Sequence, residues 1–142
     1  KPFPDHPWCE EGKALPPVSI VRYSGMIPYC MNNAHIAVDI QGLTDAFVAR
    51  MPRNPKAEWL SGGVNRIIPA GYLESLDAGQ NLIQDPDIAH YYDKLALITQ
   101  SQNLFSYERL ATIMKFNVGA YDSLLDNNRQ QVAHPSADET KP

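Results

Sequence analysis

A helix is predicted most clearly by one stretch of this chain, Asn81-Leu-Ile-Gln-Asp-Pro-Asp-Ile-Ala-His-Tyr-Tyr-Asp-Lys-Leu-Ala-Leu-Ile-Thr99. Asp85 suits the N-cap, because its carboxylate can accept a free amide hydrogen of the first turn, and Pro86 suits the first helical position. Apolar residues then recur with the spacing of one buried helix face: Ile88, Tyr91, Tyr92, Leu95 and Ile98. The pattern predicts a core helix over residues 86–100 and does not by itself indicate a reaction.

Length and composition set the class of protein. The 142 residues are 44% hydrophobic, which is enough for one folded domain with its own core. The formal charge of −4 is small and no basic stripe is present, so neither nucleic acid nor an anionic membrane surface is an expected partner. No run of 18 apolar residues occurs in the sequence. The opening Lys1-Pro-Phe-Pro-Asp-His-Pro7 lacks an initiator Met, and we expect a fragment or a matured chain.

The segments outside residues 86–100 predict an α+β fold. A small β-sheet in the N-terminal half is expected to pack against three or four helices from the C-terminal half. The expected strands are Val18–Tyr23 and His35–Ile40, with Met26–Cys30 as an edge segment. The other expected helices are Leu43–Met51, Ala70–Ala78 and Tyr107–Phe116. The predicted organisation is a Pro-rich extended arm over 1–17, a single α+β domain over 18–125 and a polar C-terminal tail over 126–142.

The two cysteines, Cys9 and Cys30, allow three interpretations. They can form a disulfide, remain two unrelated thiols, or bind a metal. The metal is least favoured, because no C-x-x-C motif or matching histidine pair accompanies them. A disulfide would stabilise the fold by about 3 kcal/mol on the loop-entropy model and would imply an oxidising compartment.

No self-contained catalytic motif is present. The chain lacks a G-x-S-x-G elbow, a P-loop and a G-x-G-x-x-G motif, and its histidines show no metal-ligand spacing: His6, His35, His90 and His134. We therefore predict no catalytic residue, no cofactor and no metal within this sequence.

Carboxylates are the most abundant side chains of this sequence that could take part in catalysis. Asp39 and Asp45 follow a predicted buried strand and could perform acid–base chemistry. We favour the simpler interpretation, in which Asp39 caps a turn and Asp45 caps the next helix. Arg50 and Arg66 could bind an anionic group, although surface pairing is the default for such residues.

Three segments resemble a known pattern. Asp39-Ile-Gln-Gly-Leu-Thr-Asp-Ala-Phe-Val-Ala-Arg-Met-Pro52 is similar to D-x-x-G/A-L-x-D-P-L-x-A-R-L-P, and Arg66-Ile-Ile-Pro-Ala-Gly-Tyr-Leu-Glu-Ser-Leu76 is similar to R-x-x-P-x-G-Y-x-E-S-L. Residues 85–99 resemble D-P-x-L-A-x-Y-Y-D-K-L-R-x-I-T. In this order, over about residues 18–125, the chain resembles the C-terminal extracytoplasmic domain of bacterial polytopic membrane glycosyltransferases of the terminal arabinofuranosyltransferase type.

The resemblance implies a context and a role. Transmembrane helices upstream of Lys1 would tether the domain to the periplasmic face of the inner membrane. The enzyme would transfer a sugar from a polyprenyl-phosphate donor to a cell-envelope glycan acceptor, using a carboxylate in the membrane-embedded part of the same polypeptide. This domain would assist acceptor binding, with six candidate substrate-binding residues: Asp39, Asp45, Arg50, Trp59, Arg66 and Tyr72. The pattern usually has Pro where Ala46 stands here and Gly-His shortly before the residue aligned with Arg66, so the sugar stays unspecified.

Two alternatives of other classes remain. The chain could be a free periplasmic binding or scaffold module with no catalytic activity. It could also be a small stand-alone hydrolase that uses Asp39 and Asp45, in which case the isolated chain would turn over a substrate.

Overall fold

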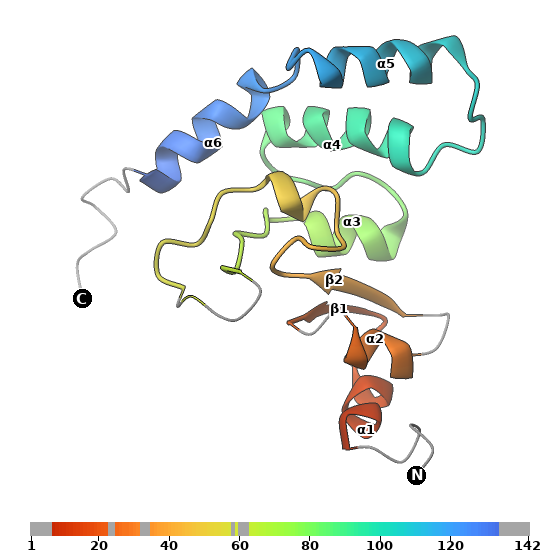
Figure 1. Ribbon diagram of the computed structural model, residues 1–142, viewed down its shortest axis with the longest axis vertical. Coiled ribbons are helices and arrows are strands. Elements are labelled where there is room, and N and C mark those ends of the chain that lie inside the picture. Colours follow the sequence, from red (N-terminus) through yellow and green to blue (C-terminus); the bar gives the residue numbers. More distant parts are fainter. Residues whose placement is uncertain (1–6, 23–24, 32–34, 58, 60–62, 134–142) are drawn as a thin grey trace.

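The computed structural model describes residues 7–22, 25–31, 35–57, 59 and 63–133. Within these residues the fold is α+β, as predicted, with a two-stranded parallel sheet and six α-helices arranged in successive layers (Figure 1). The elements are α1 (Pro7–Ala14), β1 (Val18–Val21), α2 (Met26–Cys30), β2 (Ile36–Asp39), the 3-10 turn η2 (Val48–Arg50), α3 (Tyr72–Ala78), α4 (Pro86–Thr99), α5 (Tyr107–Asn117) and α6 (Ser123–Ala133).

The sheet is parallel because the chain passes through α2 before it returns as β2. Val18 pairs with Ile36, and the register runs on to Val21 with Asp39. Both strands were predicted. The prediction of Met26–Cys30 as an edge strand is wrong, because this segment is helix α2. Pro28 is compatible with an edge strand and also with the first turn of a helix, because the amide hydrogens of that turn have no partner within the helix.

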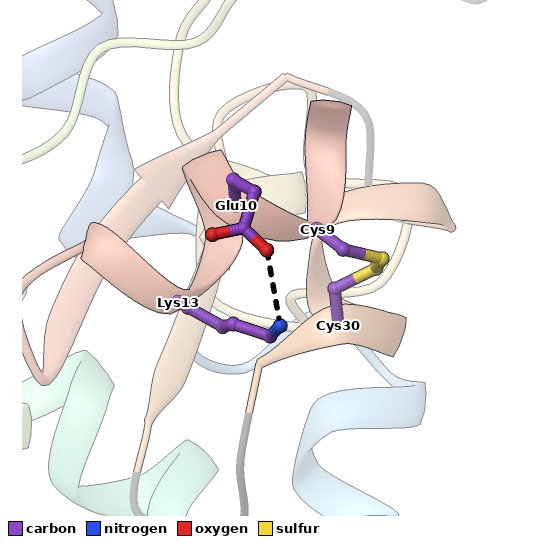
Figure 2. The surroundings of a disulfide bond; sticks show 4 residues. All are labelled: Cys9, Glu10, Lys13 and Cys30. Atoms are coloured by element: carbon purple, nitrogen blue, oxygen red, sulfur yellow. Dashed lines mark hydrogen bonds and ion pairs between the residues drawn. A yellow bond between two sulfur atoms is a disulfide. The ribbon is translucent and has the colours of Figure 1, made fainter. Parts of the chain in front are cut away.

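The N-terminal segment is folded against α2. Residues 7–14 form α1, so the prediction of an extended arm over 1–17 is wrong for this part, and residues 1–6 lie outside the described residues. A disulfide joins Cys9 of α1 to Cys30 of α2, with 4.8 Å between the Cα atoms (Figure 2). The helices approach closely: a Cβ on Gly12 would lie 3.0 Å from the carbonyl oxygen of Ile27.

Helix α4 forms the centre of the hydrophobic core. The carboxylate of Asp85 accepts hydrogen bonds from the amides of Asp87 and Ile88, which confirms the predicted cap. The predicted apolar face is buried at Ile88, Tyr91, Tyr92 and Leu95. The core around it also takes in residues from β2, η2, α3 and α6: Val38, Val48, Met51, Tyr72 and Leu125.

Helix α3 begins at Tyr72, two residues later than predicted. Gly71 precedes it with a φ of 88°, a left-handed conformation that ends the preceding loop. Gly79 stops the helix, as the sequence indicates, and also has a positive φ.

The C-terminal part continues the layering beyond α4 (Figure 1). Helix α5 begins at Tyr107 as predicted, and Ser106 caps it by accepting the amide hydrogen of Arg109. The prediction of a polar tail from residue 126 is wrong as far as Ala133, because these residues belong to α6. Leu125 near the start of α6 is buried in the core. Residues 134–142 lie outside the described residues.

Candidate functional site

Asp39 organises the loop that leaves β2. It is fully buried, and its carboxylate accepts hydrogen bonds from the amides of Gln41, Leu43 and Thr44 and from the Thr44 hydroxyl. This is the turn-capping role favoured from the sequence. With its oxygens occupied and no surface exposed, Asp39 is placed to hold the loop and not to touch a substrate.

Asp45 performs two tasks at the edge of the same loop. One carboxylate oxygen accepts the amide hydrogens of Phe47 and Val48, which confirms the predicted cap. The cap begins a shorter element than predicted, because only Val48–Arg50 of the expected helix over 43–51 adopts a helical conformation, as the 3-10 turn η2. The other oxygen accepts the hydroxyl hydrogen of Tyr72, at 2.8 Å from its oxygen.

Three aromatic rings pack beneath this hydrogen bond. The ring centroids of Phe47 and Tyr72 lie 4.6 Å apart, and both rings contact the edge of Tyr92 at 5.1 and 5.7 Å. Tilted and edge-to-face contacts at such distances are favourable for aromatic rings. The rings therefore fix the positions of η2, α3 and α4 relative to one another.

Burial raises the pKa of Tyr72 well above its usual value, and the charge and hydrogen bond of Asp45 add to the effect. Burial and Asp45 thus both favour the protonated hydroxyl that donates the hydrogen bond. Burial also raises the pKa of Tyr91, with Arg50 opposing the shift.

Two adjoining hollows lie beside this cluster, and we call them together the α4 groove. They share Tyr92 and Ala96 of α4 and Gln100, which follows the helix as its C-cap, and their volumes are about 270 and 400 Å³. The first is also lined by Thr44, Asp45, Tyr72 and Thr99, among others, and the second by Ser75, Gln80, Asn81 and Asp93, among others. The α4 groove therefore runs from the loop after β2 to the loop after α3.

The polar side chains that line the groove are neutral or negatively charged. Its described lining contains hydroxyl, amide and carboxylate side chains but no Lys, Arg or His. Asp93 is exposed and accepts a hydrogen bond of 2.8 Å from the amide nitrogen of Asn81. Such a surface suits a neutral ligand rich in hydroxyl groups and repels phosphate or carboxylate.

The six candidate substrate-binding residues thus separate in the structure. Asp45 and Tyr72 line the α4 groove, whereas Asp39 is buried beneath its loop. Trp59 is 76% exposed and belongs to neither hollow.

The two candidate arginines bind the protein's own backbone. A guanidinium nitrogen of Arg66 donates to the carbonyl oxygen of Met51 at 2.8 Å. Arg50 donates to the carbonyl oxygen of Ala46 and lies 6.0 Å from the ring centroid of Phe116. Neither arginine lines the groove, so neither is placed to hold an anion there.

Several groove residues were not singled out from the sequence. Asp93, Ala96 and Gln100 follow one another at helical spacing along the border between the buried and the exposed side of α4. Polar residues at such a position on a helix usually contact only solvent. The small side chain at position 96 is the one feature that could have indicated a hollow.

Comparison of this chain with models of protein families, with characterised proteins and with solved structures finds no match in any of the three. The resemblance to the terminal arabinofuranosyltransferase type therefore stays a prediction. In the described part of the chain, no group of three or more His, Cys, Asp or Glu residues is placed to hold a metal ion. None of the helices described has the length and apolar character needed to cross a bilayer.

Proposed function

We propose that this chain is the soluble extracytoplasmic domain of a membrane glycosyltransferase that moves a sugar from a polyprenyl-phosphate donor to a cell-envelope glycan. In this proposal the domain binds the acceptor glycan in the α4 groove and does not carry the catalytic base. The observation that supports it is the groove itself, about 270 and 400 Å³ in its two parts, whose lining combines hydroxyl, amide and carboxylate groups with apolar side chains.

The chemistry of the groove favours the acceptor over the donor. Each sugar hydroxyl both donates and accepts, and the carboxylate of Asp93 and the amide of Gln100 offer complementary partners. The Asp45 carboxylate adds negative charge to the lining, while its oxygens already accept hydrogen bonds from within the protein. A phosphate-linked donor needs cationic or backbone N–H partners, and it would meet two carboxylates here. The donor site is therefore assigned to the membrane-embedded part.

The resemblance supports the same place in the molecule. Each of the three similar segments, 39–52, 66–76 and 85–99, contributes residues to the lining: Asp45, Tyr72 and Ala96 are examples. These segments are far apart in sequence and meet at one groove. The Cys9–Cys30 disulfide supports an oxidising, extracytoplasmic location.

Glycan binding is tested by calorimetric titration of the chain with neutral arabinofuranosyl, galactofuranosyl and mannosyl oligosaccharides. We expect at least one to bind with a Kd of about 1 mM or tighter. Ala96→Phe would fill the place where the two hollows meet and abolish this binding. Ala14→Phe adds the same ring at an exposed position of α1, outside the groove, and should leave it unchanged. Absence of binding by every oligosaccharide, or equal loss in both variants, would refute acceptor binding in the groove.

The membrane context is tested separately by fractionating the native cells and probing with an antibody to this domain. A band in the inner-membrane fraction, far heavier than the 15.9 kDa of this chain, supports the glycosyltransferase. A soluble band near that mass contradicts it. Glycan binding together with such a soluble band would instead indicate the free periplasmic binding module.

A further inference from the structure

Helix α5 is apolar on the side that faces away from the protein. Its inner side contacts α4 through Arg109, Thr112 and Phe116: Thr112 is buried, and the Phe116 ring lies 5.4 Å from that of Tyr91. The outer side carries exposed Tyr107, Leu110, Met114 and Val118, and the preceding loop adds Leu104 and Phe105. We call these six residues the α5 stripe.

The stripe is continuous and strongly exposed. The positions 107, 110, 114 and 118 are spaced by three, four and four residues, which places them along one face of a helix. Phe105 is 85% exposed, Tyr107 87% and Val118 74%. A soluble protein rarely presents such a row of large apolar side chains to water unless another surface covers it.

Charged residues along one edge of the stripe indicate what covers it. Glu108 in the first turn and Lys115 in the last turn are exposed and lie seven residues apart, so both project on the same side of the helix. In an antiparallel pair of α5 helices with a two-fold axis at the level of residue 112, Glu108 of each copy lies within one residue, about 1.5 Å along the helix axis, of Lys115 of the other.

The apolar positions match in the same arrangement. Leu110 lies opposite Met114 of the second copy, and Tyr107 lies within one residue of its Val118. Phe105 then lies opposite the turn at Gly119 and Ala120, where small residues leave room for its ring. The surface is therefore complementary to itself about a two-fold axis, which is the property of an isologous dimer interface.

We propose that the α5 stripe is a homodimer interface in which two α5 helices pack antiparallel. The area of the α5 stripe is consistent with such an interface. An aromatic side chain brings roughly 150–250 Å² to a contact, and two such rings with four aliphatic side chains approach the about 800 Å² per partner of a standard interface. The charge-paired edge distinguishes this arrangement from attachment to a membrane, which offers no ordered partner for Glu108 and Lys115.

The dimer is tested by sedimentation velocity of the chain over a range of concentrations. We expect a dimer whose fraction rises with concentration, and Leu110→Glu should raise its Kd at least about tenfold by placing a charge in the apolar contact. Leu43→Glu places the same charge on an exposed leucine outside the stripe and should leave the Kd unchanged. A monomer at every concentration, or equal dissociation of both variants, would overturn the proposal.

The antiparallel arrangement has its own tests. A mixture of Tyr107→Cys and Val118→Cys chains should form a disulfide-linked dimer under mild oxidation. Tyr107→Cys alone should not, because its two copies would lie roughly 16 Å apart along the helix axis. Glu108→Lys and Lys115→Glu should each weaken the dimer, and the double exchange should restore it. Linked Tyr107→Cys homodimers, or no rescue by the double exchange, would contradict the antiparallel geometry.

Flotation with phosphatidylcholine vesicles tests the alternative that a membrane surface covers the α5 stripe. Binding of wild-type monomer to the vesicles, lost in Leu110→Glu and kept in Leu43→Glu, would assign the stripe to a membrane surface and overturn the dimer. No flotation of either variant or of the wild type, together with the sedimentation result above, supports it.

Discussion

The hydroxyl of Tyr72 donates a hydrogen bond of 2.8 Å to the carboxylate of Asp45, and it joins two segments 27 residues apart. The same carboxylate caps η2 through its other oxygen. One side chain thus fixes the start of η2 and its distance from α3, and both residues line the α4 groove. The wall of the groove depends on this pair.

Tyr72→Phe removes this hydrogen bond and keeps the ring. A hydrogen bond to a charged group contributes about 1.5–3 kcal/mol, and we expect the free energy of unfolding in urea to fall by about that amount. Tyr107→Phe deletes a hydroxyl from an exposed ring and should change it by less than about 0.5 kcal/mol. An equal loss in both variants would show that the Asp45 contact is not the cause.

Stability should decline at alkaline pH because of the buried tyrosines. The pKa values of Tyr72 and Tyr91 are raised in the folded state, so the folded chain keeps protons that the unfolded chain releases above pH of about 10. Their contribution is fully present below that pH and is lost as the pH rises further. Urea midpoints at increasing pH should fall less steeply in Tyr72→Phe than in the wild type, and parallel curves would contradict this origin.

Gly71→Ala should destabilise the fold severely. Gly71 has a φ of 88°, and a Cβ there would collide with the backbone carbonyl of Leu82. Positive φ alone costs an alanine about 1–3 kcal/mol, and the collision adds to it, so a loss of more than about 2 kcal/mol is expected. Gly25→Ala is the matched control, since its φ of −94° suits any residue and its Cβ would meet nothing within 4 Å. Thermal unfolding of both variants compares them directly.

Arg109 holds the end of α4 and should contribute to stability. Its guanidinium donates to the carbonyl oxygen of Ile98 through two nitrogens and to that of Leu104 through the third. Arg109→Ala leaves these carbonyls without a donor, and we expect a loss of about 1–3 kcal/mol in urea unfolding. Arg129→Ala removes an exposed partner of Asp126, 3.8 Å away, and should cost less than about 0.5 kcal/mol. Comparable losses would contradict the role of Arg109.

The sequence was most informative where the structure depends on neighbouring residues. Asp85, Pro86 and the apolar spacing after them specify α4 locally, and Asp39 and Asp45 cap the turns beside them as predicted. Helix α1 was missed because prolines surround it in the sequence, and α6 because its composition is polar. They are held by contacts distant in sequence: the Cys9–Cys30 disulfide in one case and the burial of Leu125 in the other.

The groove could be predicted only in part, since three distant segments form it. Asp45 and Tyr72 were among the candidates because they lie in the similar segments, but their hydrogen bond spans 27 positions and has no local signal. Arg50 and Arg66 were candidates for their charge and because they also lie in the similar segments. Their partners, backbone carbonyls of Ala46 and Met51, have no sequence identity to detect.

The disulfide closes a covalent ring that contains the whole of β1. A protease that cuts the backbone once between Cys9 and Cys30 would therefore release no fragment, because the two new ends remain linked through sulfur. The nick would be visible on a reducing gel and invisible as a loss of mass on a non-reducing one. For a domain exposed to proteases outside the cytoplasm, as proposed here, β1 could be nicked at its flanks and still stay attached beside β2.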